Sequence, residues 1–229
     1  MRRKNKVRRP QAKAGRMDVG RVVDRAFAES LRVKRTAWRR CRGPLLRAGA
    51  LLADCLRDGG KILLCGNGGS AADCQHFAGE MINYLSKDNP RGPLPAIALT
   101  ADSSVVTSIS NDSTFARVFA RQVEGLGRPG DVLIGISTSG GSHNVVQAVQ
   151  AARRMGMKVV ILTGSSGVLA GMADCALRVP SANTQRIQET HILMEHLLCQ
   201  LGETKTRKNQ VLKAKGKNLN KKPKKHKCP

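Results

Sequence analysis

Residues 61–80 read KILLCGNGGSAADCQHFAGE, and this stretch indicates the fold more clearly than any other part of the chain. Its first six residues are mostly apolar, which is typical of a buried strand. The glycine-rich turn at 66–69 then leads into a helical pattern. A strand, a glycine turn and a helix start together present backbone N–H groups that can hold a phosphate group. A tight connection without a ligand is the alternative interpretation of this turn.

A His/Glu pair lies on the helix predicted after the turn. His76 and Glu80 are four residues apart, so they share one helix face about 6 Å apart. Such pairs are common on solvated helix surfaces, and a surface pair is the simpler interpretation. The glycine turn lies in the same short segment, however, and the combination indicates an enzyme that acts on a phosphorylated small molecule.

Five short apolar runs alternate with helical patterns along the chain. This alternation predicts a doubly wound α/β fold, in which a parallel five-stranded sheet is flanked by helices. The expected strands are residues 61–66, 95–100, 131–137, 158–164 and 175–180.

The segments before and after the sheet are also predicted to be helical. From about residue 19 to residue 56 the apolar residues recur at helical spacing, with CRGP at 41–44 as the expected break between two helices. The DGG sequence at 58–60 should end the second helix. A further helix is expected over 143–156, and a last one over 184–201.

A second loop, STSGGS at 137–142, is rich in hydroxyl groups and follows the third expected strand. Ligands of doubly wound sheets bind beyond the carboxyl ends of the strands, where this loop and the 66–69 turn both lie. Helix capping is the alternative, but three serines, a threonine and two glycines exceed what a cap requires. Several oxygens of one phosphate group can be held here by Ser137, Thr138, Ser139 and Ser142.

The 229-residue chain has a formal net charge of +24, and nearly all of it lies at the two ends. Residues 1–42 contain 16 Lys and Arg against 3 Asp and Glu, and residues 203–229 contain 11 against 1. We expect a basic N-terminal extension over 1–16, one folded domain over 17–203 and a disordered basic tail over 204–229. Aromatic residues make up only 3%, which argues against a dedicated nucleic-acid-binding domain. Salt-sensitive contact of the ends with nucleic acid or another polyanion is a secondary expectation.

The cysteines and the apolar segments indicate the compartment. Seven cysteines show no C-x-x-C spacing, and no apolar stretch is long enough to cross a membrane. The N-terminal segment lacks the apolar core of a secretory signal. These features are typical of a reduced, cytoplasmic protein.

Five segments of the chain resemble a known family. They are GNGGSAADCQHFAGE, LPAIALTADSS, SNDSTF, RPGDVLIGISTSGGS and RIQETHILMEHLLCQL, which occur in this order between residues 19 and 203. These segments are similar to the sugar-isomerase (SIS) domain of phosphoheptose isomerases. The resemblance implies interconversion of sedoheptulose 7-phosphate and D-glycero-D-manno-heptose 7-phosphate, which leads to nucleotide-activated heptose for lipopolysaccharide. It also implies a homotetramer with active sites between subunits, and one bound zinc ion per subunit.

The resemblance further implies roles for particular residues. The catalytic positions fall on Glu80 and His196, and the metal ligands fall on His76, Glu80, Gln188 and His196. The substrate contacts fall on Asn67, Gly68, Gly69, Ser70, Glu80, Asn111, Asp112, Ser137, Thr138, Ser139, Ser142 and Gln188. Neither His191 nor Glu195, which lie on the same predicted helix as His196, is assigned a role.

An aldose–ketose shift requires groups of this kind. A base removes the proton α to the carbonyl and returns it to the neighbouring carbon, while an acid or a metal ion stabilises the oxyanion. Glu80 can serve as the base and His196 as its acid/base partner, and His76, Glu80 and Gln188 offer ligands compatible with zinc. Gln188 and His196 lie about 12 Å apart along a helix. They reach one metal ion only if their side chains converge, or if one of them acts in a neighbouring subunit.

Two other functions fit parts of the pattern. Bacterial replication-initiator-associating proteins are similar SIS tetramers that act as non-catalytic scaffolds, but they lack the carboxylate of Glu80 and the imidazole of His196. This chain has both groups, which favours the enzyme. An isomerase of another sugar phosphate is the second alternative, because the phosphate loops do not discriminate the length of the sugar.

Overall fold

The computed structural model describes residues 18–88 and 90–219. The extension expected over 1–16 lies outside these residues, as does 220–229, the last part of the expected tail. Within the described ranges, no helix combines the length and the apolar character needed to cross a bilayer.

A five-stranded parallel sheet forms the centre of the molecule, in the order β2-β1-β3-β4-β5. All five predicted strands and the doubly wound α/β fold are confirmed. Every residue of β1 and β3 is buried, which explains why their sequences are continuous apolar runs. The strands are β1 (Ile62–Gly66), β2 (Ala96–Ala98), β3 (Val132–Ser137), β4 (Lys158–Thr163) and β5 (Cys175–Arg178).

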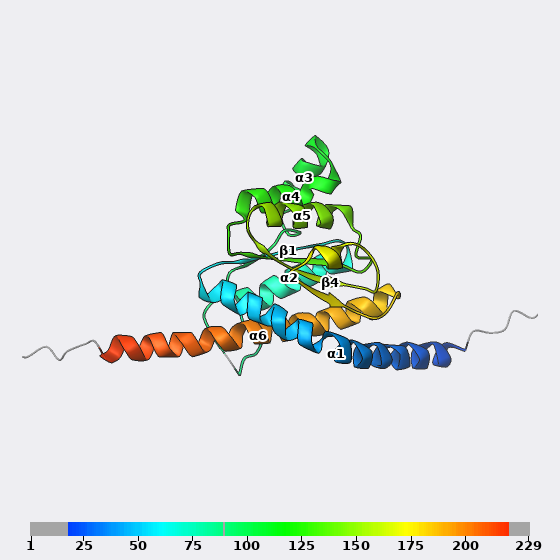
Figure 1. The fold of residues 1–229 in the computed structure, drawn as a ribbon. Helices are drawn as coiled ribbons and strands as arrows, with labels where there is room; N and C mark the ends of the chain where they lie inside the picture. The colour runs from blue at the N-terminus through cyan, green and yellow to red at the C-terminus, as the bar shows by residue number, and fades with distance from the viewer. Residues whose placement is uncertain (1–17, 89, 220–229) are drawn as a thin grey trace, which may run out of the picture.

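Helices cover both faces of the sheet (Figure 1). Successive residues of β1 point to opposite faces, so that Ile62 and Leu64 join one core and Leu63 and Cys65 join the other. One face is covered by α1 (Val19–Arg57), α2 (Gly69–Ile82) and α6 (Thr184–Leu219). The other is covered by α4 (Val118–Leu126) and α5 (His143–Arg154), and α3 (Ser103–Asp112) packs on the outside of α4. Two short 3-10 helices are η1 (Phe115–Arg117) and η2 (Leu169–Met172).

The N-terminal segment is one continuous helix, so the break predicted at 41–44 is wrong. Helix α1 runs through Pro44, although a proline in a helix interior costs about 3 kcal/mol. Packing against β5 offsets this cost. The Cys41 thiol donates to the Arg178 carbonyl oxygen at 3.2 Å, and the Cys175 thiol donates to the Pro44 carbonyl oxygen at 3.1 Å. These contacts hold the helix on the sheet edge one turn before the proline and at the proline itself.

The last helix is longer than predicted. Helix α6 continues to Leu219 instead of ending near Leu201, so 204–219, expected as part of a disordered tail, is helical in the structure. The added segment is rich in lysine, and lysine, alanine and leucine have favourable helix propensities. The first half of α1 and the second half of α6 extend beyond the body of the molecule on opposite sides (Figure 1).

A buried ion pair joins the amino ends of β1 and β3. The Asp131 side chain is only 3% exposed and lies 2.5 Å from Lys61 Nζ. Its carboxylate also accepts hydrogen bonds from the backbone N–H groups of Lys61 and Arg128, both at 2.9 Å. Because both oxygens are paired, the buried charge is fully compensated. The pair lies at the end of the sheet opposite the two predicted ligand loops.

Candidate active site

The turn between β1 and α2 depends on glycine. A Cβ atom at Gly66 would lie 2.8 Å from the Ser70 carbonyl oxygen and 3.0 Å from that of Ile136, so only glycine permits this close approach. Gly68 has a φ of 57°, which glycine adopts without strain. A Cβ atom there would meet nothing within 4 Å. The N-cap of α2 at Gly68 therefore faces open space, as an anion site at a helix N-terminus requires.

The loop after β3 forms a cluster of hydroxyl groups. Ser137 Oγ lies 2.9 Å from Ser142 Oγ and 3.4 Å from Ser139 Oγ. Ser142 occupies the N-cap position of α5, but its side chain forms no capping hydrogen bond. Helix capping therefore does not account for this side chain. The Thr138 carbonyl oxygen accepts a hydrogen bond from the Gly164 backbone N–H at 3.1 Å, which holds the loop against the segment after β4.

Asn144, which the sequence analysis did not select, joins the two loops. Its Nδ2 donates to Asn67 Oδ1 at 2.8 Å, and Asn67 Nδ2 donates to Asn144 Oδ1 at 2.9 Å. The Val145 backbone N–H also donates to Asn144 Oδ1, which fixes the orientation of both amides. Asn144 is only 4% exposed. The signal in the sequence is an asparagine on the buried face of an amphipathic helix, in phase with Ala148 and Ala151.

Three of the four predicted catalytic and metal residues meet between α2 and α6. His76 Nε2 lies 2.8 Å from His196 Nε2, and the two ring planes are inclined at 73°. Glu80 Oε1 lies 3.7 Å from His76 Nε2, since the two residues share one face of α2. One imidazole donates a hydrogen bond to the other, so the pair holds a proton beside a carboxylate.

The fourth residue, Gln188, lies against the glycine turn. A Cβ atom at Gly69 would lie 2.2 Å from Gln188 Nε2, so the amide occupies the space beside the first residue of α2. In the described part of the chain, no hydrogen bond joins Gln188 to His76, Glu80 or His196. The approach of Gln188 is a reason for glycine at position 69 that the sequence alone did not give.

Asn111 and Asp112 lie in the other helical layer, at the end of α3. Asn111 Nδ2 donates to Asp112 Oδ1 at 2.8 Å, and both residues are exposed. Among the residues that the structure describes, neither forms a hydrogen bond with another predicted site residue. The start of α3 follows β2, and the pair lies at the other end of this ten-residue helix, outside the His76 cluster.

Three ionisable groups between α2, α6 and β4 were given no role by the sequence analysis, and two of them are buried while Asp73 is half-buried. His191 and Glu195 are 0% and 1% exposed. Both nitrogens of His191, both oxygens of Glu195 and Asp73 Oδ2 have no hydrogen-bond partner within 18–88 and 90–219. Burial, together with nearby Asp73, raises the pKa of Glu195 to about 8, and burial lowers the pKa of His191 to about 4. Both side chains are therefore mainly uncharged at neutral pH.

The cluster of His76, Glu80 and His196 offers the nitrogen and oxygen donors that zinc prefers. Ligand atoms around a tetrahedral zinc ion lie roughly 3.3 Å apart, given bonds of about 2.0 Å. The imidazole nitrogens are closer, at 2.8 Å, because they are hydrogen-bonded to each other. Accordingly, the described residues include no group of three or more His, Cys, Asp or Glu side chains arranged to hold a metal ion. The donor types fit zinc, while the rings are placed as a hydrogen-bonded pair.

The sheet order, the glycine turn and the serine-rich loop define the class of protein. The SIS domain family model matches residues 27–164. The phosphoheptose isomerase of Coxiella burnetii (strain Dugway 5J108-111) is 48% identical over 193 residues, which cover 82% of this chain and 96% of that protein. The phosphoheptose isomerase of Neisseria gonorrhoeae (strain NCCP11945) is 51% identical over 177 residues, covering 76% and 89%. This chain belongs to the SIS domain family and, within it, to the phosphoheptose isomerases.

Solved structures are similar over the same part of the chain. The structure of phosphoheptose isomerase from Neisseria gonorrhoeae has a TM-score of 0.76 and 47% identity, and the match covers 81% of this chain and 99% of that one. The structure of a phosphoheptose isomerase from Francisella tularensis has a TM-score of 0.78 and 39% identity, with coverage of 82% and 100%. The family expected from the sequence is confirmed.

Proposed function

We propose that this protein is an aldose–ketose isomerase that interconverts sedoheptulose 7-phosphate and D-glycero-D-manno-heptose 7-phosphate, for the synthesis of nucleotide-activated heptose. The observation that carries the proposal is the arrangement along α2. This helix begins at the glycine turn and carries His76 seven residues after Gly69, about 10 Å along its axis. That separation is comparable with the length of an extended seven-carbon sugar phosphate. The phosphate group of the substrate can thus bind at the N-terminus of α2 while its carbonyl group lies beside His76.

The two loops supply the phosphate-binding end. The hydroxyl groups of Ser137, Ser139 and Ser142 gather at one side of this end. The N-terminus of α2 contributes backbone N–H groups and the positive end of a helix dipole at the other side. Asn144 orients the Asn67 amide between them. In this proposal the remaining contacts come from Gly68, Gly69, Ser70 and Thr138.

The His76 cluster supplies the proton-transfer end. Glu80 removes the proton from the carbon next to the carbonyl group, which gives an enediol, and returns it to the neighbouring carbon. His196 donates a proton to the carbonyl oxygen as negative charge develops there. The hydrogen bond between His76 Nε2 and His196 Nε2 sets which ring nitrogen carries that proton. Glu80 and His196 are the proposed catalytic residues.

Zinc is part of the proposal. His76, Glu80 and His196 would hold the ion, which would polarise the carbonyl oxygen of the substrate as a Lewis acid. The Gln188 amide lies beside Gly69, which supports a substrate contact at the phosphate end. Its place among the metal ligands stays a prediction.

A homotetramer is also proposed, with α1 at its interfaces. Apolar side chains at helical spacing form an exposed stripe on the first half of this helix, each between 49% and 70% exposed. Exposed apolar surfaces of this kind are typical of protein interfaces. The stripe consists of Val19, Val22, Val23, Phe27 and Leu31. If the active site is shared between subunits, Asn111 and Asp112 of one subunit would contact the substrate bound to a neighbouring subunit.

A cytoplasmic location is the last part of the proposal. The described cysteines are all free and buried, which supports a reducing, cytoplasmic location.

Turnover of sedoheptulose 7-phosphate by the purified protein, with and without added zinc, tests the proposal. Glu80→Gln and His196→Ala should each lower kcat by about 100-fold or more, because each removes a proton-transfer group. His143→Ala is the matched control, since this exposed histidine on α5 lies outside the cluster, and it should leave kcat unchanged. A folded wild-type protein without turnover under any metal condition would rule out the heptose reaction. Other sugar phosphates and the scaffold function would then be tested.

A further inference from the structure

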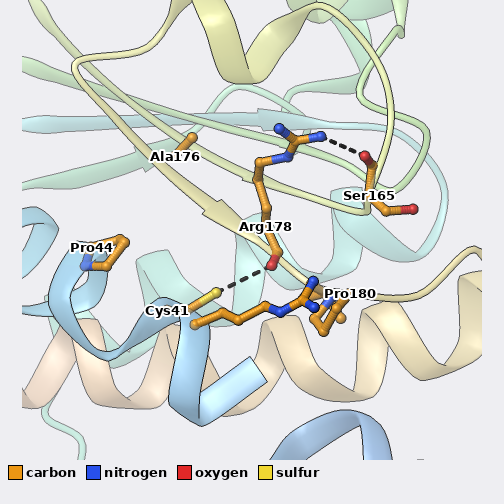
Figure 2. Close-up of a pocket in the computed structure, with 8 residues that line it drawn as sticks. Cys41, Pro44, Ser165, Ala176, Arg178 and Pro180 are labelled. Atoms are coloured by element: carbon orange, nitrogen blue, oxygen red, sulfur yellow. Dashed lines mark hydrogen bonds between the residues drawn. The ribbon is translucent and has the colours of Figure 1, made fainter. Parts of the chain in front are cut away.

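A cavity lined by both apolar and polar residues lies between α1 and the edge strand β5 (Figure 2). Its volume is about 410 Å³, and its lining includes Arg40 and Cys41 from α1, Arg178 from β5, and Ser165 from the segment after β4. This volume falls within the range of about 300–1,000 Å³ that is common for small-molecule sites. None of the predicted active-site residues lines the cavity. It is therefore separate from the site described above.

Two guanidinium groups line this cavity without a compensating charge. The lining contains no Asp or Glu, and neither Arg40 nor Arg178 forms an ion pair with any residue that the structure describes. Burial raises the pKa of the Cys41 thiol, so this group adds no negative charge. Both side chains are exposed, so solvent screens their mutual repulsion, and an anion bound in the cavity would be attracted by two guanidinium groups at once. Guanidinium groups bind phosphate through paired N–H donors, which makes phosphate the best-matched anion.

Arg178 connects the cavity to the segment that follows β4. Its Nη2 donates to the Ser165 carbonyl oxygen, as Figure 2 shows. The Ser165 backbone N–H and hydroxyl group both lie within hydrogen-bond distance of the Ser181 carbonyl oxygen, at 3.4 Å and 3.1 Å. The position of Ser165 therefore depends on a charged contact with Arg178 at the end of β5 and on two contacts with Ser181 beyond this strand.

The same segment supports the serine-rich loop of the proposed active site. Ser166 Oγ donates to the Ser139 carbonyl oxygen at 3.4 Å, and the Gly164 backbone N–H donates to that of Thr138 at 3.1 Å. A Cβ atom at Gly140 would lie 2.2 Å from the Ser166 carbonyl oxygen, so the two backbones touch. If residues 164–167 become more or less rigid, the serine-rich loop that contacts them must therefore become so as well.

We propose that the cavity binds the phosphate group of a small organic phosphate, and that this binding orders the serine-rich loop. Arg178 has five N–H donors and uses one of them on Ser165, so the others remain for the anion together with those of Arg40. The bound anion would hold Arg178 in place and, through Ser165, fix residues 164–167 against the loop. Because such coupling is reciprocal, phosphate bound at either site should raise the affinity of the other. Only the effect on turnover rests on the proposed isomerase function.

Titration calorimetry with inorganic phosphate tests this proposal. The wild-type protein should bind phosphate at two classes of site, and Ser139→Ala should weaken the class that belongs to the serine-rich loop. Arg40→Ala should weaken the other class at least about tenfold, the loss expected for a charge-assisted contact of about 1.5 kcal/mol. Arg39→Ala is the matched control, because Arg39 is an exposed neighbour on α1 that does not line the cavity. It should bind phosphate as the wild type does.

The coupling needs a variant of its own. Arg178→Met keeps the aliphatic stem and removes the guanidinium group, so it should weaken both classes of site. Arg40→Ala binding phosphate as tightly as Arg39→Ala would overturn the cavity as a phosphate site. Loss of only the cavity class in Arg178→Met would overturn the coupling. Tungstate, an anomalous scatterer that replaces phosphate, can be soaked into crystals to locate the bound anion. Anomalous density is expected between Arg40 and Arg178. Density at the serine-rich loop alone would refute the cavity as a phosphate site. These measurements need no turnover, so they remain readable if the isomerase assay fails.

Discussion

The two ends of the sheet treat buried polar groups in opposite ways. At the amino end, Asp131 is paired on both oxygens, by the side chain and backbone of Lys61 and by a further backbone N–H. Near the carboxyl end, Thr163 Oγ1 and Glu195 have no hydrogen-bond partner among the described residues, although both are buried. Buried polar groups are normally satisfied, and exceptions collect where a protein binds ligands or moves protons. The comparison indicates that one end maintains the fold and the other end is available for chemistry.

The largest expected effect is at the amino end. Asp131→Ala leaves Lys61 Nζ and two backbone N–H groups without their acceptor, so the free energy of unfolding should fall by about 3–5 kcal/mol. Urea denaturation at neutral pH measures this loss. Asp54→Ala is the control, because it breaks an exposed pair with Arg57 and should cost less than about 1 kcal/mol. Similar small losses in both variants would remove the distinction between the two ends.

The next effect is a pH dependence of the folding stability, and it arises from the Glu195 carboxyl group, which has no hydrogen-bond partner among the described residues. Its pKa in the folded protein is about 8, above the ordinary value of 4.5, so the native state holds a proton that the unfolded chain releases. This contribution to stability is complete at low pH and is lost as the pH rises toward 8. His191, with its pKa lowered to about 4 from 6.5, acts in the opposite sense below pH 6.5. A net decline of roughly 1–1.5 kcal/mol is therefore expected between pH 6.5 and 8.

Glu195→Met should abolish this decline, since it replaces the carboxyl group with an apolar side chain of similar length. Thermal unfolding measured from pH 6.5 to 8 provides the comparison, and the variant should be more stable than the wild type at pH 8. Asp24→Asn, which removes an exposed carboxylate on α1, should keep the wild-type decline. If the stability of Glu195→Met declined with pH in parallel with that of the wild type, the decline would not come from the Glu195 carboxyl group.

Much of this architecture could be predicted from the sequence because it follows from local patterns. Apolar runs bounded by turns identified all five strands, and the His76/Glu80 spacing placed both side chains on one face of α2. The break at Pro44 was wrong because packing on β5, a contact distant in sequence, carries α1 across the proline. The role of Asn144 was missed for the same reason, since its partner Asn67 lies 77 residues away. Local patterns identify elements, whereas contacts between elements complete the site.

The third prediction tests whether the paired amides belong to the chemical end of the sheet. Asn144→Leu removes both hydrogen bonds to Asn67 and should lower kcat/KM for the sugar phosphate about tenfold, since about 1.4 kcal/mol of orientation is lost. Most of the change should appear in KM, because the Asn67 amide lies at the phosphate end. Gln150→Leu, an exposed change on the same helix, is the control.

Asn144→Asp separates orientation from mere packing. A protonated aspartic acid can donate and accept, as the asparagine amide does, whereas the carboxylate can only accept. Activity of this variant relative to the wild type should therefore improve as the pH is lowered. A KM ratio that does not change with pH would show that Asn144 matters only for packing.

The smallest effect is expected at Gly69, where Gln188 of α6 lies against the phosphate-binding end of the proposed site. Gly69→Ala would place a Cβ atom 2.2 Å from Gln188 Nε2, so the Gln188 amide must swing away, which a long side chain can do at little cost. The backbone there is helical, so stability should change by less than about 1 kcal/mol. If Gln188 contacts the substrate, KM should rise about threefold while kcat stays near the wild-type value, the pattern of a lost binding contact. Gly79→Ala, on the same helix with open space around its Cβ position, should leave KM unchanged. Equal KM values in both variants would place Gln188 outside the substrate site and leave His196 as the proposed site residue that α6 contributes.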